Sequence, residues 1–241
     1  MIRTPIFFEH KRKRLLNMNL ETLKKLNQDI TIKPIYDLSF LKYGKVLPFS
    51  LFEDYAAYLE QETKIPQTLN QYIADDPHLH TLFKVSPLIN DIFDHASLEF
   101  GYVNGNNSSL NALEFHPSAE INIAITPLVL MLGHANDIKD LTYDVNRLEA
   151  YYIPARTAIV INSHVLHFSP CKVSDEGFKC GVILPYGTNM AFVSPEEKIR
   201  LNEPLLYKTN KWLLAHPDNQ TLLDLGAYPG LKGKNINIEY K

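Results

Sequence analysis

The chain is short of cysteine, tryptophan, net charge and long apolar runs. It has two cysteines and one tryptophan in 241 residues. Cys171 and Cys180 do not have the spacing of a metal knuckle and are too few for a disulfide framework, so we expect reduced thiols in a cytoplasmic protein. The net charge of -3 supplies no positive surface for a polyphosphate partner, and no run approaches the ~18 apolar residues that cross a bilayer. Nucleic-acid and membrane partners are therefore not expected.

An ordinary apolar fraction is present, and it is sufficient for a core. Hydrophobic residues make up 45% of the chain, as in typical globular proteins. The first residues differ from the rest, because a basic run at 11–14 precedes an apolar stretch that is too short for a secretory signal. We expect 1–17 to be a dispensable, disordered leader. A basic arm that contacts a partner is the alternative.

The most informative segment contains three metal-ligand side chains in a strand-like run. Alternate residues of a strand share a face, so Glu114 and His116 are predicted to point the same way. A Pro-Ser turn follows, and the alternating run at 121–126 can fold back and bring Glu120 toward that pair. Two uncompensated carboxylates inside a barrel would each cost several kcal/mol. A divalent cation would convert that cost into a binding site.

Helices are predicted before this segment and strands around it. Apolar spacing favours helices at 20–27, at 51–63 with Ser50 as N-cap, and at 87–95, whereas 75–80 reads as a solvated loop. The C-terminal stretch 208–215, which holds the tryptophan, is predicted to be helical.

Short strands separated by Asn, Gly and Pro are predicted from residue 98 onward. They cover 99–103, 110–116, 121–126, 128–132, 148–153, 157–162, 164–168 and 178–184. This pattern is typical of a barrel or jelly roll. We therefore expect a mainly β fold with a barrel core at 98–190, a helical and extended N-terminal segment at 18–97 packed on it, and a helical and turn-rich appendage at 191–241.

Two motifs resemble those of the cupin superfamily. The first is Glu-x-His-x-x-x-Glu at 114–120, and the second is a Pro turn and strand that lead to His167. In cupins, His and Glu side chains hold a divalent metal in the mouth of a jelly-roll barrel. Here Glu114 replaces the usual first histidine, and His167 stands later than the usual second-motif histidine. The resemblance implies Glu114, His116, Glu120 and His167 as metal ligands.

Two narrower likenesses accompany these motifs. The long gap before His167 is similar to the ureidoglycolate lyase branch of cupins. From Met18 onward the chain resembles a bacterial cupin-type family of unknown function, on the hallmark segments at 101–108, 113–124, 166–171, 176–180 and 210–217. The family likeness implies a homodimer.

Each ligand has a simpler interpretation. Glu114 and His116 could form a salt-bridged surface pair, Glu120 could be a turn carboxylate, and His167 could be a core histidine. Their combination favours ligation. Oxygen and imidazole donors suit Mn²⁺, Fe²⁺, Zn²⁺ or Co²⁺, and four protein ligands leave open positions on a five- or six-coordinate ion.

An open coordination position implies a bound substrate. We expect a metal-dependent isomerase or lyase that acts on a small sugar, sugar acid, or hydroxy or keto acid, with Lys179 or Tyr152 as the catalytic proton carrier. Asn104, Asn106 and Arg156 are the predicted substrate-binding residues. Lys179 could instead lie on the solvated surface, and the Asn-rich loop could be only a tight turn. The alternative functions are a non-catalytic sugar-binding cupin and a ureidoglycolate-type lyase.

Overall fold

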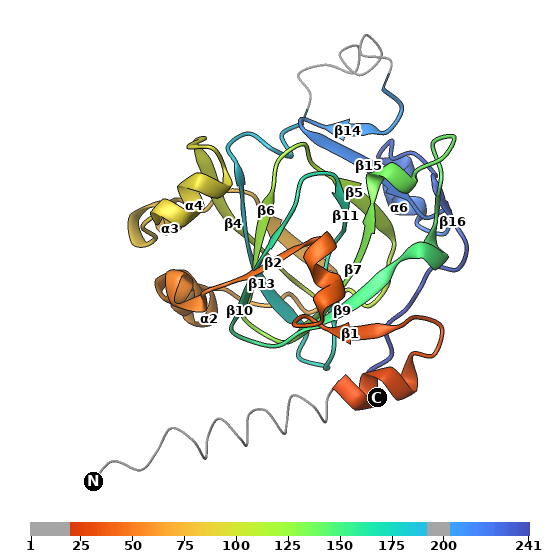
Figure 1. Ribbon diagram of the computed structural model, residues 1–241, viewed down its shortest axis with the longest axis horizontal. Helices are drawn as coiled ribbons and strands as arrows, with labels where there is room; N and C mark the ends of the chain where they lie inside the picture. The colour runs from red at the N-terminus through yellow and green to blue at the C-terminus, as the bar shows by residue number, and fades with distance from the viewer. Residues whose placement is uncertain (1–19, 192–202) are drawn as a thin grey trace.

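The computed structural model describes residues 20–191 and 203–241, and strands dominate them (Figure 1). One sheet of five strands contains β1 (Ile32–Pro34), β9 (Glu149–Ile153), β7 (Leu128–His134), β11 (Val165–Leu166) and β12 (Cys171–Lys172). A second sheet of six strands contains β2 (Gly44–Leu47), β10 (Thr157–Ile161), β6 (Glu120–Ala124), β13 (Phe178–Pro185), β4 (Leu98–Gly105) and β3 (Asn70–Ile73).

Two smaller sheets come mainly from the C-terminal part. The first contains β14 (Leu206–Lys208), β15 (Lys211–Ala215) and β5 (Ala112–Phe115), and the second contains β16 (Leu231–Lys232) and β8 (Tyr143–Asp144). The helices are 20–26, α2 (Glu53–Glu62), α3 (Pro77–Leu82), α4 (Pro87–Ile92) and α6 (Gln220–Asp224). Short 3₁₀ turns cover Leu38–Lys42, Phe49–Phe52, Ala135–Asp137 and Val145–Arg147. Among the described residues, no helix has the length and apolar character of a membrane span.

The two large sheets face each other across a buried layer. Leu130 and Leu132 of β7 and Tyr151 of β9 pack in one cluster with Cys180 and Val182 of β13. Most neighbouring strands are antiparallel; β1 with β9 and β16 with β8 are parallel. Within the described ranges the strand pairing does not close into one ring, so the mainly β core predicted as a barrel or jelly roll is formed by two facing sheets.

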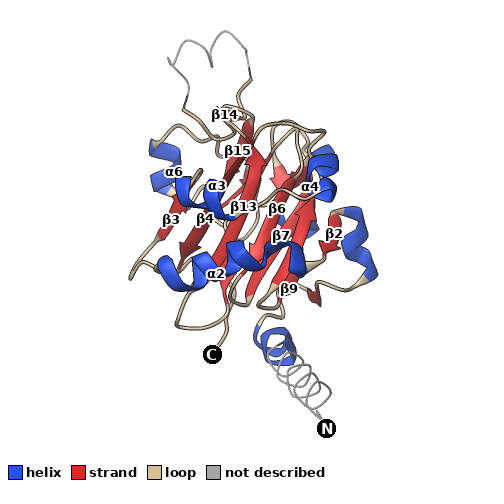
Figure 2. Ribbon diagram, turned by 90° about the vertical axis from the view of Figure 1, so that its left-hand side faces the viewer, coloured by secondary structure: helices blue, strands red, loops and turns tan. Residues whose placement is uncertain are grey.

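The outer faces of both large sheets are also covered. Phe52 and Tyr55, at the start of α2, and Leu79 of α3 pack on the six-stranded sheet, and Figure 2 shows α2 and α3 lying across it. Leu23 of helix 20–26 and Ile238 near the C-terminus belong to the cluster on the outer side of the five-stranded sheet. A side chain on either face of these strands is therefore buried.

Each strand predicted from residue 98 onward overlaps an observed strand, and the helices at 20–27 and 87–95 are confirmed within the described residues. Three details differ. The turn containing Ser50 is 3₁₀, and α2 starts at Glu53 without a side-chain cap. The loop at 75–80 contains α3, capped by Asp76. The stretch at 208–215 is not helical, because β15 pairs with β5 along its length.

Candidate metal centre

Backbone pairing brings Glu114 and His167 together. The Glu114 amide donates to the His167 carbonyl at 2.6 Å, and the His167 amide donates to the Glu114 carbonyl at 2.9 Å. These two bonds make an antiparallel bridge just beyond β11. Residues directly opposite in such a bridge project their side chains to the same face. His116, two residues after Glu114 along the extended chain, joins that face.

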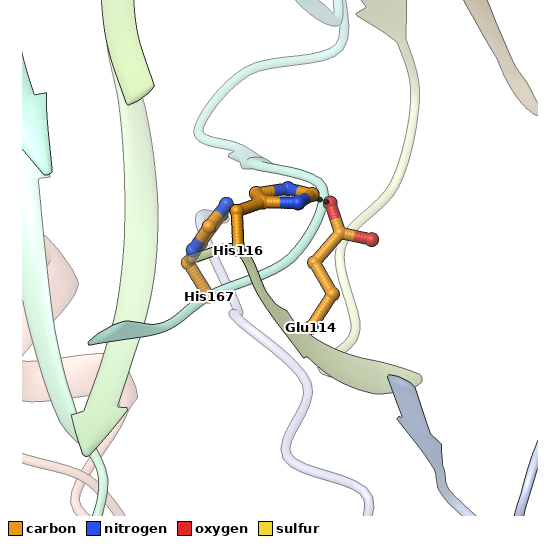
Figure 3. A group of neighbouring side chains, drawn as sticks. All are labelled: Glu114, His116 and His167. Atoms are coloured by element: carbon orange, nitrogen blue, oxygen red, sulfur yellow. Dashed lines mark ion pairs between the residues drawn. The ribbon is translucent and has the colours of Figure 1, made fainter. Parts of the chain in front are cut away.

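The ligand atoms converge on one buried point. One donor atom from each of Glu114, His116 and His167 lies within 4.8 Å of the other two, and Figure 3 shows the three side chains turned toward one another. Glu120, the first residue of β6, completes the group: its Oε2 lies 3.5 Å from His116 Nε2 and 3.2 Å from His167 Nε2. The structure thus brings together all four side chains that the sequence predicts as ligands.

Backbone carbonyls orient both imidazoles. His116 Nδ1 lies 2.8 Å from the Asn210 carbonyl, and His167 Nδ1 lies 3.0 Å from the Val165 carbonyl. A carbonyl only accepts, so each Nδ1 must carry its proton and donate. The Nε2 atoms then face the carboxylates of Glu114 and Glu120. This is the second-shell arrangement typical of metal-binding histidines.

A divalent cation fits this donor set. His116 Nε2 is buried and has no hydrogen-bond partner among the described residues, although carboxylate oxygens lie 3.5 and 3.8 Å away. A neutral imidazole nitrogen and a carboxylate oxygen are both acceptors, and they can approach only when a proton or a cation lies between them. Two carboxylates and two imidazoles suit Mn²⁺, Fe²⁺, Co²⁺ or Zn²⁺.

In the absence of a metal, ion pairs stabilise this group of side chains. Burial alone would lower the pKa of His167, but the charge and hydrogen bond of Glu120 outweigh it and raise this pKa to about 9. Burial likewise opposes ionisation of Glu114 and Glu120. Lys211 and His116 nevertheless lower the pKa of Glu114, and His167 lowers the pKa of Glu120. The metal-free site therefore keeps a proton on His167 where the metal would bind.

A cavity of about 210 Å³ opens beside the ligands. Glu114, Glu120, His167 and Lys211 are the charged residues of its wall. The other lining residues are Asn70, Tyr72, Val103, Asn122, Phe168, Ser169, Pro170, Val182, Leu184 and Asn189. This volume is below the ~300–1,000 Å³ of pockets for drug-sized ligands, so the cavity suits a small molecule.

Among the cavity residues that sequence reasoning missed, two contact the ligand carboxylates. Asn122 follows Glu120 by two positions and donates to Glu120 Oε1 at 2.6 Å, so strand alternation could have identified it. Lys211 ion-pairs with Glu114 Oε2 from β15. Trp212 pairs with Phe115, so Lys211 stands diagonally to Glu114 across the strand pair. No local pattern in the sequence predicts the ion pair between Lys211 and Glu114.

The predicted catalytic residues lie elsewhere. The Lys179 ammonium donates to the carbonyls of Leu59, Glu60 and Thr63, at 2.8, 3.1 and 2.7 Å, at the end of α2. Tyr152 is 2% exposed and packs in the cluster on the outer side of the five-stranded sheet. Both side chains point away from the layer between the sheets, so neither is brought to the ligand group.

The predicted substrate-binding residues also lie outside the cavity. Asn104 donates to Thr63 Oγ1 at 3.0 Å, and Asn106 donates to the Pro66 carbonyl at 2.6 Å, so both brace the segment after α2. Arg156 ion-pairs with Glu53 at the other end of α2. These contacts hold the three side chains away from the cavity, although the Asn104 Oδ1 atom has no hydrogen-bond partner among the described residues.

Another carboxyl group on the six-stranded sheet is unusual. Glu99 is 3% exposed and pairs across the sheet with Leu184 of the cavity wall. Its Oε2 accepts from the Gly187 amide at 2.9 Å, whereas its Oε1 has no hydrogen-bond partner in the described part of the chain. Burial raises the pKa of Glu99 to about 7. The carboxyl is thus partly protonated near neutral pH.

Together, the fold and the site define a mainly β protein with a candidate His/Glu metal centre between antiparallel sheets. The chain belongs to the family described as Domain of unknown function (DUF4867), which matches residues 32–236. No curated protein matches it.

Several solved structures resemble parts of the chain at low identity. A mutant of Bacillus subtilis oxalate decarboxylase is 16% identical, with a TM-score of 0.35 over 73% of this chain and 41% of that one. Salicylate 1,2-dioxygenase from Pseudaminobacter salicylatoxidans is 11% identical, with a TM-score of 0.30 over 54% of this chain and 30% of that one. This chain therefore spans less than half the length of either enzyme.

Proposed function

We propose that the protein is a metal-dependent enzyme that acts on a small sugar, sugar acid, or hydroxy or keto acid by isomerase or lyase chemistry. The observation that carries the proposal is the convergence of Glu114, His116, Glu120 and His167 with a buried His116 Nε2 that lacks a hydrogen-bond partner. A buried imidazole nitrogen that faces only carboxylate oxygens is an acceptor without a donor, and a cation would satisfy it. The cupin-like order of these four residues in the sequence supports the same interpretation.

Four protein ligands favour an ion that accepts five or six, which points to Mn²⁺ or Fe²⁺ rather than tetrahedral Zn²⁺. When bound, such an ion would polarise a substrate carbonyl and acidify the adjacent C–H group. The protein's own part is to bind, orient and exclude water. Val103, Val182 and Leu184 form an apolar part of the cavity wall.

Tyr72 is a candidate for orienting the substrate. Its hydroxyl accepts from Asn189 Nδ2 at 3.0 Å, so its own proton is free to be donated into the cavity that both residues line. Burial raises the pKa of Tyr72, which keeps the hydroxyl protonated at neutral pH. A substrate oxygen would receive this hydrogen bond. We propose this role in place of those predicted for Lys179 and Tyr152.

Metal analysis of the purified protein tests the proposal. We expect about one equivalent of a transition metal in the wild type and a drop of at least ~100-fold in metal affinity in His116→Ala, since a ligand should matter more than its second shell. His80→Ala is the matched control, because His80 pairs with a carboxylate of Asp75 at 2.6 Å but lies outside the site. A wild type that takes up no stoichiometric metal would contradict the proposal.

Non-catalytic sugar binding is the alternative outcome. A cavity without ionisable groups other than the ligands would favour it, yet Tyr72 and Lys211 line this one. Metal-loaded protein that binds a small sugar without turnover, in a screen of isomerase and lyase substrates, would select the binding function.

A further inference from the structure

Lys211 is the one cavity-lining cation outside the ligand group in the described ranges, and its position is defined by the C-terminal hairpin. The turn between β14 and β15 presents the Asn210 carbonyl to His116, and the next residue, Lys211, reaches Glu114. Its side chain is only 13% exposed and lies 5.9 Å from the centroid of the Phe168 ring. The ammonium is thus held at the wall of the cavity beside the proposed metal ligands.

The charges around this lysine do not balance once a divalent ion is bound. Ligating imidazoles are neutral, so the two carboxylates of Glu114 and Glu120 offset the two positive charges of the ion. Lys211 then remains as one positive charge without an equivalent negative charge in the cavity wall. Glu114 can direct one oxygen to each cation, but its single charge cannot neutralise both. A largely buried, uncompensated ammonium costs several kcal/mol.

We propose that Lys211 anchors a carboxylate of the substrate, so that the enzyme acts on a small monoanion such as a sugar acid, a hydroxy acid or a keto acid, and not on a neutral sugar. This inference rests on the proposed function, whose substrate class it narrows. One negative charge restores neutrality beside the loaded metal centre. The remaining polar wall, with Tyr72, Asn122 and Asn189, is uncharged and suits hydroxyl or carbonyl oxygens. The volume of about 210 Å³ limits the substrate to a few carbon atoms.

If Lys211 anchors an anion, its replacement should weaken anion binding but should not weaken metal binding. Removal of a cation next to Glu114 removes repulsion of the incoming metal, so Lys211→Met should bind Mn²⁺ as tightly as the wild type or more tightly. The same change should weaken anion binding, because a charge-assisted hydrogen bond is lost. A residue needed only for folding would lower both affinities. The two measurements together therefore separate anchoring from a structural role.

The experiment uses Mn²⁺-loaded protein titrated with glycolate and glycerate, and with their neutral amides, while water proton relaxation by the bound Mn²⁺ is followed. For the acids we expect binding to the wild type and a ~10- to 100-fold loss in Lys211→Met. For the amides we expect less than about a twofold change between these two proteins. Lys211→Arg should recover most of the loss. Lys234→Met is the matched control, since Lys234 pairs with Asp29 on the surface and lies outside the cavity wall.

The possible results distinguish failure of the proposed function from failure of the Lys211 anchor. A wild type that takes up no Mn²⁺ would overturn the proposed function and this inference with it. Normal Mn²⁺ uptake would leave the metal centre intact but overturn the anchor if neither acid binds, if Lys211→Met binds the acids like the wild type, or if acids and amides lose affinity equally.

Discussion

Metal binding should release a proton from His167. In the metal-free protein the His167 imidazole is buried against Glu120, with Nε2 3.2 Å from the carboxylate, and its pKa is raised to about 9. The same Nε2 must be deprotonated to bind a metal. At neutral pH the metal therefore competes with a proton, and its apparent affinity should rise with pH.

The size of the effect follows from the raised pKa. For a group with a pKa of about 9 that must lose its proton, the apparent affinity should increase about 90-fold between pH 6 and pH 8. At pH 7 nearly one proton should leave for each Mn²⁺ bound. The stability of the metal-free protein should change with pH in the opposite direction to its metal affinity. Because the folded pKa lies above the ordinary value of 6.5, the metal-free protein should have the full contribution of this ion pair below pH 6.5 and lose it as pH rises through 9. That contribution is roughly 3 kcal/mol.

Isothermal titration calorimetry with Mn²⁺ measures both quantities. Titrations at pH 7 in buffers of different ionisation enthalpy give the number of protons released, and titrations from pH 6 to pH 8 give the slope of affinity. His80→Gln, which changes a surface histidine, should leave both unchanged. Tight binding of Mn²⁺ with no proton release and no pH dependence would refute the reasoning, because His167 would then not exchange its proton for the metal.

Three further outcomes are expected. Lys179→Met should lower the free energy of unfolding by about 1–2 kcal/mol, because three carbonyls at the end of α2 lose their donor. The variant should leave the Mn²⁺ affinity unchanged, and a loss of metal binding in calorimetry would contradict the placement of Lys179. Glu99→Gln should stabilise the protein by about 1–3 kcal/mol at pH 8 and have little effect at pH 4.5, because a carboxyl whose pKa is raised to about 7 opposes folding once it ionises. Urea unfolding at the two pH values measures this difference, and equal effects at both would contradict the raised pKa of Glu99. Gly181→Ala should lower the melting temperature, because a Cβ there would lie 2.7 Å from the buried Tyr55 ring; an unchanged temperature would show that the ring can move aside.

The placement of Lys179 and Tyr152 shows where sequence reasoning failed. Alternation along β13 and β9 correctly separated two faces, but both faces of these strands are buried: one against the layer between the sheets and one against helices or terminal segments. An alternating pattern identifies the inner face only when the other face is solvated. The pattern therefore left the direction of Lys179, Tyr152 and Asn104 undetermined.

The sequence by itself determined the longer strands between residues 98 and 185 and the local part of the ligand set. The period of two in a strand places Glu114 and His116 on one face whatever the rest of the fold does, and the short turn keeps Glu120 close to them. Only the tertiary structure decided where the cavity lies beside the ligands and which charged residue lies in its wall. The contact of Lys211 with Glu114 depends on the pairing of β15 with β5, a contact between segments far apart in the chain that no local periodicity encodes.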